Sequence, residues 1–500
     1  MNQNKILLNR TFRLFFAGVF LISVFAGCIL LGPRMLNMDG DLGRHLTVGA
    51  YILDSGKIPT VDLFSNSMAG LPFTPHEWLS EVVFALAYRF MGLTGVVLLT
   101  ALLIALVWYR LSFVVLRESK SFYISLILII TGIAASSIHW ISRPHIFTYL
   151  FLIIWIAIYQ SRLRIQYKYL LIFVVMVLWV NSHGAFITGI VYICIDLLGK
   201  FIKMMHGRKV IQQFHTLTEI GLILGLSLLA IFVNPVGFHI LSTIFGFLGN
   251  QYLTTNTMEY QAPNLLAIPY IPYDLFLIIS VMIIIKARKS VSIPDFMQII
   301  TWSIFGLISA RNIPLAVLVG LPILGKLYGL NRLKIGAEIE RSGQKFQLVK
   351  SRFNWEGVLI IPVTISLIAI SLYGIFPGLG MRNEFLPEKF PTKAMEYVEQ
   401  YPMEGNMFNE FTWGGYLLFR LWPEQKVFID GQTDFYGEKL TRDYEVIYNA
   451  EPGFDGLMQK YSVEWVIIRR TASLAEELDK DPGDWTKEFA DQLTVIYARK

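Results

Sequence analysis

Apolar runs about as long as a bilayer is thick recur along most of this chain. They extend from Leu14 to Phe376, and an α-helix needs about 20 mainly apolar residues to cross the hydrocarbon core. The composition agrees, because 54% of the residues are hydrophobic and 16% are charged, whereas soluble domains carry about 25% charged residues. The sequence therefore predicts a polytopic α-helical membrane protein and excludes a soluble globule.

About eleven transmembrane helices are predicted from these runs. The spans cover residues 14–32, 93–116, 121–139, 146–160, 169–181, 184–199, 218–233, 267–285, 295–310, 313–329 and 357–376. Residues 78–91 are too short to span comfortably and carry Glu81 and Arg89, so we expect an interfacial helix there. If that segment crossed the membrane instead, every later loop would change sides.

Basic residues are distributed unevenly between the two sides of this topology. With a cytoplasmic N-terminus, 23 lysines and arginines fall in cytoplasmic segments and six in the opposite loops, as the positive-inside rule requires. We therefore predict a multi-pass protein of the plasma (inner) membrane. The net charge of +6 reflects this topology rather than a basic soluble face, so no nucleic-acid partner is expected. Cys28 and Cys194 lie inside apolar runs and offer neither a disulfide nor a zinc-binding pair.

The chain divides into two regions by composition. Residues 1–376 form the predicted transmembrane domain, with residues 33–92 as its first extracytoplasmic loop, and residues 377–500 form a predicted extracytoplasmic α/β domain. Within this tail, strands are predicted at residues 406–408, 426–429, 463–468 and 493–498, and amphipathic helices near residues 392–399 and 472–478. Asp430 and Asp434 follow a buried strand, where they are either ligand-binding residues or ordinary turn residues.

Polar side chains that are unusual at membrane depth gather in the predicted extracytoplasmic connections. These candidate site residues are Asp39, Asp41, Arg44, His45 and Glu77 in the first loop, Arg143 and His145, Asn181 and His183, Glu259, and Arg311 in later connections. Charged and imidazole groups at such depth are costly unless they face a wet cavity. We therefore expect five separate connections to converge on one functional site.

Each of these groups also has an ordinary structural interpretation. The pair Asp39 and Asp41 also fits a solvated turn, since acidic turns are common after a membrane span. Arg143 and His145 are as consistent with an interfacial anchor as with a phosphate-binding pair. Asn181 and His183 could cap helices. Arg311 favours an anion such as a phosphate, because an unpaired guanidinium between two apolar runs is expensive.

The first loop resembles the GT-C superfamily of glycosyltransferases, which use sugars linked to polyprenyl phosphate. It is most similar to the aminoarabinose and protein mannosyl transferases, whose acidic residue is followed three positions later by arginine, here Asp41 and Arg44. A short helix ending at Ser55-Gly56 and then Pro59 completes that pattern. These relatives typically have a second acidic residue directly after the first, whereas this chain has Leu42 there and Asp39 instead. Which carboxylate acts therefore stays open.

Other motifs resemble a group of uncharacterised bacterial membrane proteins of the same superfamily. They are Trp179-Val180-Asn181-Ser182-His183-Gly184, Asn234-Pro235-x-Gly237, Trp413-Gly414-Gly415-Tyr416 and Val427-Phe428-Ile429-Asp430-Gly431. This likeness spans nearly the whole chain but supplies no substrate. From the superfamily's domain layout, we expect the tail to take part in acceptor recognition.

The resemblance implies a hexosyl or pentosyl transferase that moves a sugar from a polyprenyl-phosphate donor to a lipid, glycan or protein acceptor outside the membrane. Such transfer needs a base for the acceptor proton and cations for the departing phosphate. Asp41 or Asp39 is the expected base, and Arg143, His145, His183 and Arg311 are the expected phosphate ligands. We expect inversion at the anomeric carbon and no metal requirement, with a divalent cation on Asp39, Asp41 and His45 as the alternative.

Two other functions are consistent with a polytopic membrane protein. A transporter or lipid flippase places polar residues near the bilayer midplane on broken helices, often in two related halves. The sequence contains no such repeat, and its polar residues lie at span ends. A scaffold that binds partners through its tail would leave Asp41 and Arg311 without a purpose.

Overall fold

Long apolar helices make up most of the molecule. The computed structural model describes residues 10–205, 210–341, 382–481 and 483–500. The helices of the first part are α1 (Arg10–Leu30), α2 (Gly32–Asn37), α3 (Leu42–Ser55), α4 (Trp78–Ser119), α5 (Phe122–Ser136), α6 (His145–Tyr159), α7 (Ile165–Val180), α8 (Ile187–Met205), α9 (Val210–Ala230), α10 (His239–Gly249), α11 (Gln251–Asn256), α12 (Ile271–Lys286), α13 (Ile293–Ile308) and α14 (Ile313–Arg341). Single 3-10 turns, η1 (Ser137–His139), η2 (Gly184–Phe186), η3 (Met258–Tyr260) and η4 (Ala310–Asn312), lie between some of them.

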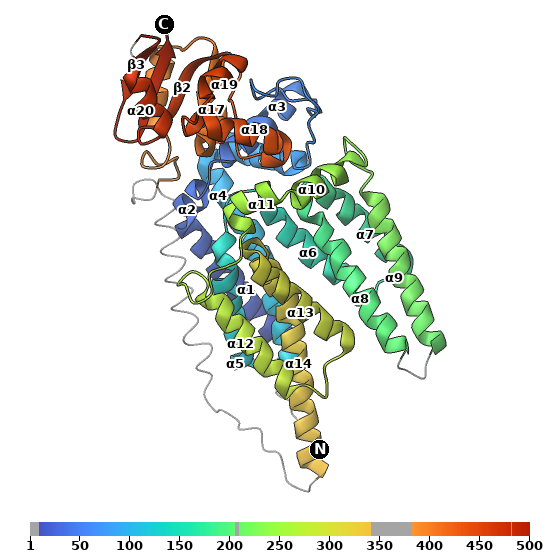
Figure 1. The fold of residues 1–500 in the computed structure, drawn as a ribbon. Coiled ribbons are helices and arrows are strands. Elements are labelled where there is room, and N and C mark those ends of the chain that lie inside the picture. Colours follow the sequence, from blue (N-terminus) through green and yellow to red (C-terminus); the bar gives the residue numbers. More distant parts are fainter. Residues whose placement is uncertain (1–9, 206–209, 342–381, 482) are drawn as a thin grey trace.

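The helices are those expected of an integral membrane protein. Within the described residues, five are long and apolar enough to cross a bilayer, namely Arg10–Leu30, Trp78–Ser119, Phe122–His139, Gly184–Met205 and Ala310–Lys334. Shorter apolar helices accompany them in the bundle (Figure 1). The polytopic helical fold is thus confirmed, while the count of eleven spans stays a prediction. The predicted span at residues 357–376 lies outside the described residues.

A sharp bend divides α4 where the sequence predicts a boundary. Met91 and Gly92 leave helical geometry, and Gly92 has a φ of 58°, which glycine adopts without steric cost. The bend separates the segment that begins at Trp78 from the long apolar part of α4. The short helix predicted in the first loop is α3, which ends at Gly56 in the left-handed conformation typical of a helix C-terminus.

The tail contains a small mixed sheet with strand order β1-β2-β4-β3. Its elements are α16 (Thr392–Gln400), β1 (Asn406–Asn409), α17 (Gly414–Leu421), α18 (Thr433–Tyr448), α19 (Phe454–Lys460), β2 (Val463–Arg469), α20 (Ser473–Lys480), β3 (Trp485–Ala490) and β4 (Thr494–Arg499), with the 3-10 turn η6 (Phe411–Trp413) before α17. Strand β1 is parallel to β2, and the other two pairings are antiparallel. Three of the four predicted strands are confirmed as β1, β2 and β4.

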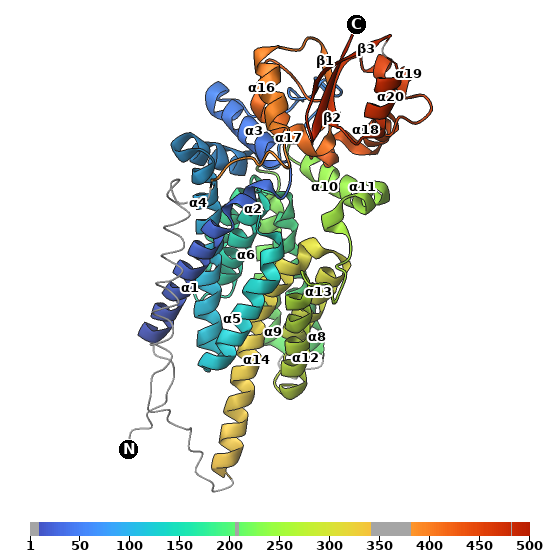
Figure 2. The same cartoon turned by 90° about the vertical axis from the view of Figure 1, so that its left-hand side faces the viewer.

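The fourth predicted strand, residues 426–429, pairs with the first loop instead of joining the sheet. Val427 forms an isolated parallel bridge with Ser65, and the backbone of Asn66 donates to its carbonyl at 2.9 Å. Helix α17 also packs against α3, and α10 and α11 pack against α18. The tail therefore lies at one end of the helical bundle, in contact with the first loop (Figures 1 and 2).

Candidate functional site

Seven of the predicted site residues form one connected group at the end of the bundle that faces the tail. This group, here called the polar cluster, comprises Asp39, Asp41, Glu77, Arg143, His183, Glu259 and Arg311. They come from five connections that are far apart in the sequence. The structure therefore brings together side chains that the sequence placed on the same side of the bundle.

Arg143 holds three carboxylates. Its Nη2 lies 2.6 Å from Oδ2 of Asp41, and its Nη1 lies 3.2 Å from Oδ2 of Asp39 and 3.6 Å from Oε1 of Glu259. Burial alone would lower the pKa of Arg143, but Asp41 and Asp39 hold it well above the ordinary value. Burial raises the pKa of Asp39, against the opposing effect of Arg143.

The two acidic residues of the first loop differ in their hydrogen bonds. Asp39 accepts the backbone N–H of Asp41 at Oδ1, at 3.1 Å, and Arg143 at Oδ2, so both its oxygens are engaged. Asp41 contacts Arg143 through Oδ2, and among the described residues its Oδ1 makes no hydrogen bond. Asp41 therefore keeps one carboxylate oxygen for a proton or a ligand.

Glu259 lies between two guanidinium groups. Its Oε1 is 3.4 Å from Nη1 of Arg311 and 3.6 Å from Nη1 of Arg143. Burial would raise the pKa of Glu259, but Arg311 and Arg143 lower it to about 2. Arg311 also donates to the Tyr260 hydroxyl at 2.5 Å. One carboxylate oxygen thus occupies the point where two cations converge.

Imidazole rings surround Glu77. His183 Nε2 lies 3.6 Å from Oε1 of Glu77, His76 Nε2 lies 3.9 Å from the same oxygen, and His45 Nδ1 lies 3.8 Å from Oε2. Burial lowers the pKa of His183, and Arg311 lowers it further, so this ring is neutral and its Nε2 can accept from Arg311 at 3.1 Å. The His183 ring therefore holds and orients the Arg311 guanidinium.

A second carboxylate makes this corner a possible metal-binding group. His45 Nδ1 is 3.1 Å from Oε1 of Glu81, and one ligand atom each from His45, Glu77 and Glu81 lie within 4.8 Å of one another. Imidazole and carboxylate ligands suit zinc or manganese, so the donor set fits such an ion. The set considered from the sequence differs, because Asp39 and Asp41 pair with Arg143 rather than with His45.

The remaining predicted residues lie beside the polar cluster or point away from it. Among the described residues, His145 forms no hydrogen bond with a residue of the polar cluster. Its Nε2 lies 2.9 Å from the carbonyl oxygen of His139. Asn181 links the ends of three helices. Its amide donates to the carbonyls of Val177 in α7 and Val233 after α9, and it accepts from the indole of Trp78 at the start of α4 at 2.7 Å. Arg44 forms a buried ion pair with Asp430 of the tail, at 2.7 Å.

Sequence reasoning missed three residues near the polar cluster. Glu81, His139 and Tyr260 each contact one of its members or His45. His76, a polar residue of the first loop, also contacts Glu77. His139 was counted as the last residue of an apolar span, although a histidine in the last turn of a span is itself a signal of a wet site. Glu81 was treated as a residue of an interfacial helix, and its direction depends on how α4 packs against α3.

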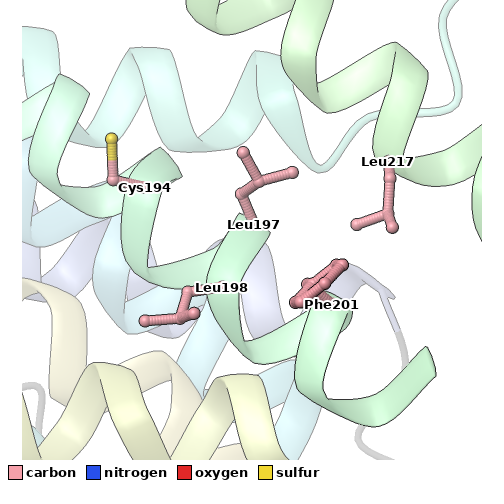
Figure 3. A pocket seen from close by; sticks show the side chains of 5 residues that line it. All are labelled: Cys194, Leu197, Leu198, Phe201 and Leu217. Atoms are coloured by element: carbon pink, nitrogen blue, oxygen red, sulfur yellow. The ribbon is translucent and has the colours of Figure 1, made fainter. Parts of the chain in front are cut away.

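Two cavities differ in their relation to the polar cluster. One of about 370 Å³ lies between α8 and α9, is lined by Cys194, Leu197, Leu198, Phe201 and Leu217, and is apolar (Figure 3). It lies in the half of α8 that is distant from His183, so it is separate from the polar cluster. A smaller polar cavity of about 100 Å³ is lined by Pro72, Thr74, Thr243, Asp434 and Phe435, next to His76.

The fold and the cluster together define a polytopic membrane protein with a charged site at the surface end of its helices. No known protein-family model matches the chain, and no curated protein matches its sequence. Among solved structures it is similar to the oligosaccharyltransferase AglB of Archaeoglobus fulgidus, in complex with an inhibitory peptide and a dolichol-phosphate. That match has 11% identity and a TM-score of 0.54, and covers 97% of this chain and 75% of AglB.

A second similar structure is ArnT of Cupriavidus metallidurans bound to undecaprenyl phosphate. It is 14% identical with a TM-score of 0.54, and the match covers 96% of this chain and 97% of ArnT. Each match covers nearly the whole of this chain and therefore most of the tail. The chain therefore has the GT-C fold, as the resemblance of its first loop predicts.

Proposed function

We propose that this protein is a membrane glycosyltransferase that moves a sugar from a polyprenyl-phosphate donor to an extracytoplasmic acceptor. The observation that carries the proposal is the meeting of Asp41, Arg143 and Arg311 in one charged cluster at the end of a GT-C bundle. ArnT and AglB, which share the fold, were solved with undecaprenyl phosphate and dolichol-phosphate. We also propose that the protein lies in the inner membrane with its N-terminus in the cytoplasm.

Asp41 is the proposed base. Its free Oδ1 takes the proton from an acceptor hydroxyl or amine, and the acceptor atom then attacks the anomeric carbon. The bond from that carbon to the donor phosphate oxygen breaks, and its electron pair stays on the phosphate. A single direct displacement inverts the anomeric centre. Asp39 supports Asp41 by accepting its backbone N–H and by sharing Arg143.

Arg143 and Arg311 are the proposed phosphate ligands. Guanidinium groups match phosphate oxygens in geometry and stabilise the negative charge that develops on the leaving group. Oε1 of Glu259 now lies at 3.4–3.6 Å from both groups, where a phosphate oxygen would bind. Donor binding would therefore move Glu259 away from at least one arginine. Neutral His183 accepts from Arg311 and so orients this guanidinium toward the phosphate, and the His145 ring lies next to that of His183.

A divalent cation, where bound, would neutralise charge near Glu77. His45, Glu77 and Glu81 are the residues that would hold it. His45 also serves these carboxylates without a metal, because burial would lower its pKa but Glu81 and Glu77 raise it above the ordinary value. The raised pKa favours the positively charged form of His45 beside these carboxylates.

Reconstituted protein tests the proposal against its main rival, a lipid flippase. Proteoliposomes would carry a panel of radiolabelled polyprenyl-phosphate sugars, with release of sugar to water or to extracted membrane acceptors measured separately from movement of intact donor. Release or transfer that depends on Asp41 supports the glycosyltransferase. Movement of intact donor without sugar release would instead favour the flippase.

A further inference from the structure

Two sequence motifs of the tail contribute no residue to the proposed chemistry. They are Trp413-Gly414-Gly415-Tyr416, at the start of α17, and Val427–Gly431. Both lie against the first loop, because α17 packs on α3 and Val427 bridges to Ser65. Their position, rather than their side-chain chemistry, is the informative feature.

Glycines allow the backbones of α3 and α17 to touch. A Cβ on Gly43 would lie 2.3 Å from the carbonyl oxygen of Gly415, and a Cβ on Gly415 would lie 2.3 Å from that of Gly40. A Cβ on Gly40 would lie 1.9 Å from the carbonyl oxygen of Thr412. Since these neighbours are backbone atoms, no side-chain movement can make room. The start of α3 is therefore seated directly on the tail.

The same contact reaches the proposed base. A Cβ on Gly431 would lie 1.7 Å from Oδ1 of Asp41. The segment that carries Gly431 is itself fixed, because the side chain of Asn409 accepts the backbone N–H of Phe428 at 2.7 Å and donates to the carbonyl of Ile429 at 2.9 Å. Gly431 thus packs against Oδ1 of Asp41, and Arg143 pairs with Oδ2.

A buried ion pair locks this arrangement. Arg44 Nη1 lies 2.7 Å from Oδ2 of Asp430, and both side chains are buried. Oδ1 of Asp430 accepts the backbone N–H of Gln432 at 3.0 Å, so the carboxylate is oriented on both sides. Arg44 follows Asp41 by three residues, less than one turn along α3. A buried pair of this kind is weak evidence for stability but can specify a unique geometry.

We propose that Asp430 and Gly431 are positioning residues, which hold Asp41 in place through Arg44 and through direct contact. The inference rests on the proposed function, and it makes the tail an integral part of the catalytic site. It assigns Asp430 to positioning rather than to ligand binding, and it gives both tail motifs a purpose.

Gly431→Ala is the sharpest catalytic test, because the added methyl group must displace Asp41. A misplacement of about 1 Å can reduce a rate about 100-fold, so we expect kcat to fall by about that factor while KM for the donor stays within about twofold. Gly456→Ala in α19 is the matched control, since nothing lies within 4 Å of its Cβ. It should leave kcat and the melting temperature unchanged. An unchanged kcat in Gly431→Ala would overturn the proposal.

The ion pair is tested by a double-mutant cycle. Arg44→Gln and Asp430→Asn each leave one buried charge without its partner, so both should lower kcat and the melting temperature. The double variant replaces the ion pair by two neutral amides, so it should recover part of the loss in kcat and part of the loss in melting temperature. Losses that simply add would contradict a positioning pair.

Hydrogen exchange measured by mass spectrometry separates this inference from the proposed function. Exchange at the start of α3, in residues 41–46, should accelerate in Gly431→Ala and in Asp430→Asn but not in Gly456→Ala. Unchanged exchange there would overturn the positioning role whatever the enzyme does. A wild-type protein without turnover would overturn the proposed function, and the exchange data would still decide the contact between tail and first loop.

Discussion

Glu259→Gln should lower the melting temperature of the ligand-free protein and increase the rise in melting temperature that a lipid phosphate causes. The carboxylate of Glu259 lies 3.4 and 3.6 Å from the two arginines. The fall in its pKa from 4.5 to about 2 corresponds to about 3 kcal/mol of favourable interaction, at about 1.4 kcal/mol for each pH unit. Because the pKa in the folded state is lowered, this stabilisation is fully present above pH 4.5 and is lost as the pH falls through about 2.

Removal of the charge also removes the competitor of the donor phosphate. Thermal unfolding in detergent, with and without undecaprenyl phosphate, measures both effects. We expect Glu259→Gln to melt lower than wild type without the lipid, and to show a larger rise in melting temperature when the lipid is added. The arginines would then exchange a weak amide partner for a phosphate.

Glu219→Gln is the matched control, because Glu219 pairs with Lys168 at 3.0 Å outside the polar cluster. Its response to undecaprenyl phosphate should equal that of wild type. A rise in Glu259→Gln that is no larger than in wild type would refute the idea that Glu259 occupies the phosphate position.

Two further predictions concern the charges of the site. Arg143→Lys should reduce transfer about 100-fold, because one ammonium group cannot replace a planar fork that contacts Asp39 and Asp41 together; Arg89→Lys, at an exposed ion pair, should retain wild-type turnover. Transfer should also persist in EDTA, since His45 already contacts Glu77 and Glu81, and these carboxylates raise its pKa and so favour the positively charged ring. Activity lost in EDTA and restored by zinc or manganese would assign a metal to these residues.

Much of the helical framework could be predicted because it depends on local properties. The cost of burying a charge in lipid limits where spans can lie, and the bias of basic residues predicts their sides. The end of α3 at Gly56 and the bend at Gly92 follow from the backbone freedom of glycine. For the same reason the candidate residues could be assigned to one end of the bundle.

The detailed partners could not be predicted because they depend on contacts between distant segments. Arg44 and Asp430 are 386 residues apart in the sequence, and no local pattern pairs them. His45 meets Glu81 because α3 seats on α4 at Gly49, where a Cβ would lie 2.1 Å from the carbonyl oxygen of Glu81. Residues 426–429 have the composition of a strand, but they pair with the first loop instead of the sheet.

The most direct test of the account compares Asp41→Asn with Asp39→Asn and wild type in the reconstituted sugar-release assay. All three proteins should fold and bind undecaprenyl phosphate. We predict turnover of one donor by wild type, with loss in Asp41→Asn and a smaller loss in Asp39→Asn, since of these two residues Asp41 is the one with a carboxylate oxygen free to take the acceptor proton. Full activity in Asp41→Asn would contradict the proposed base.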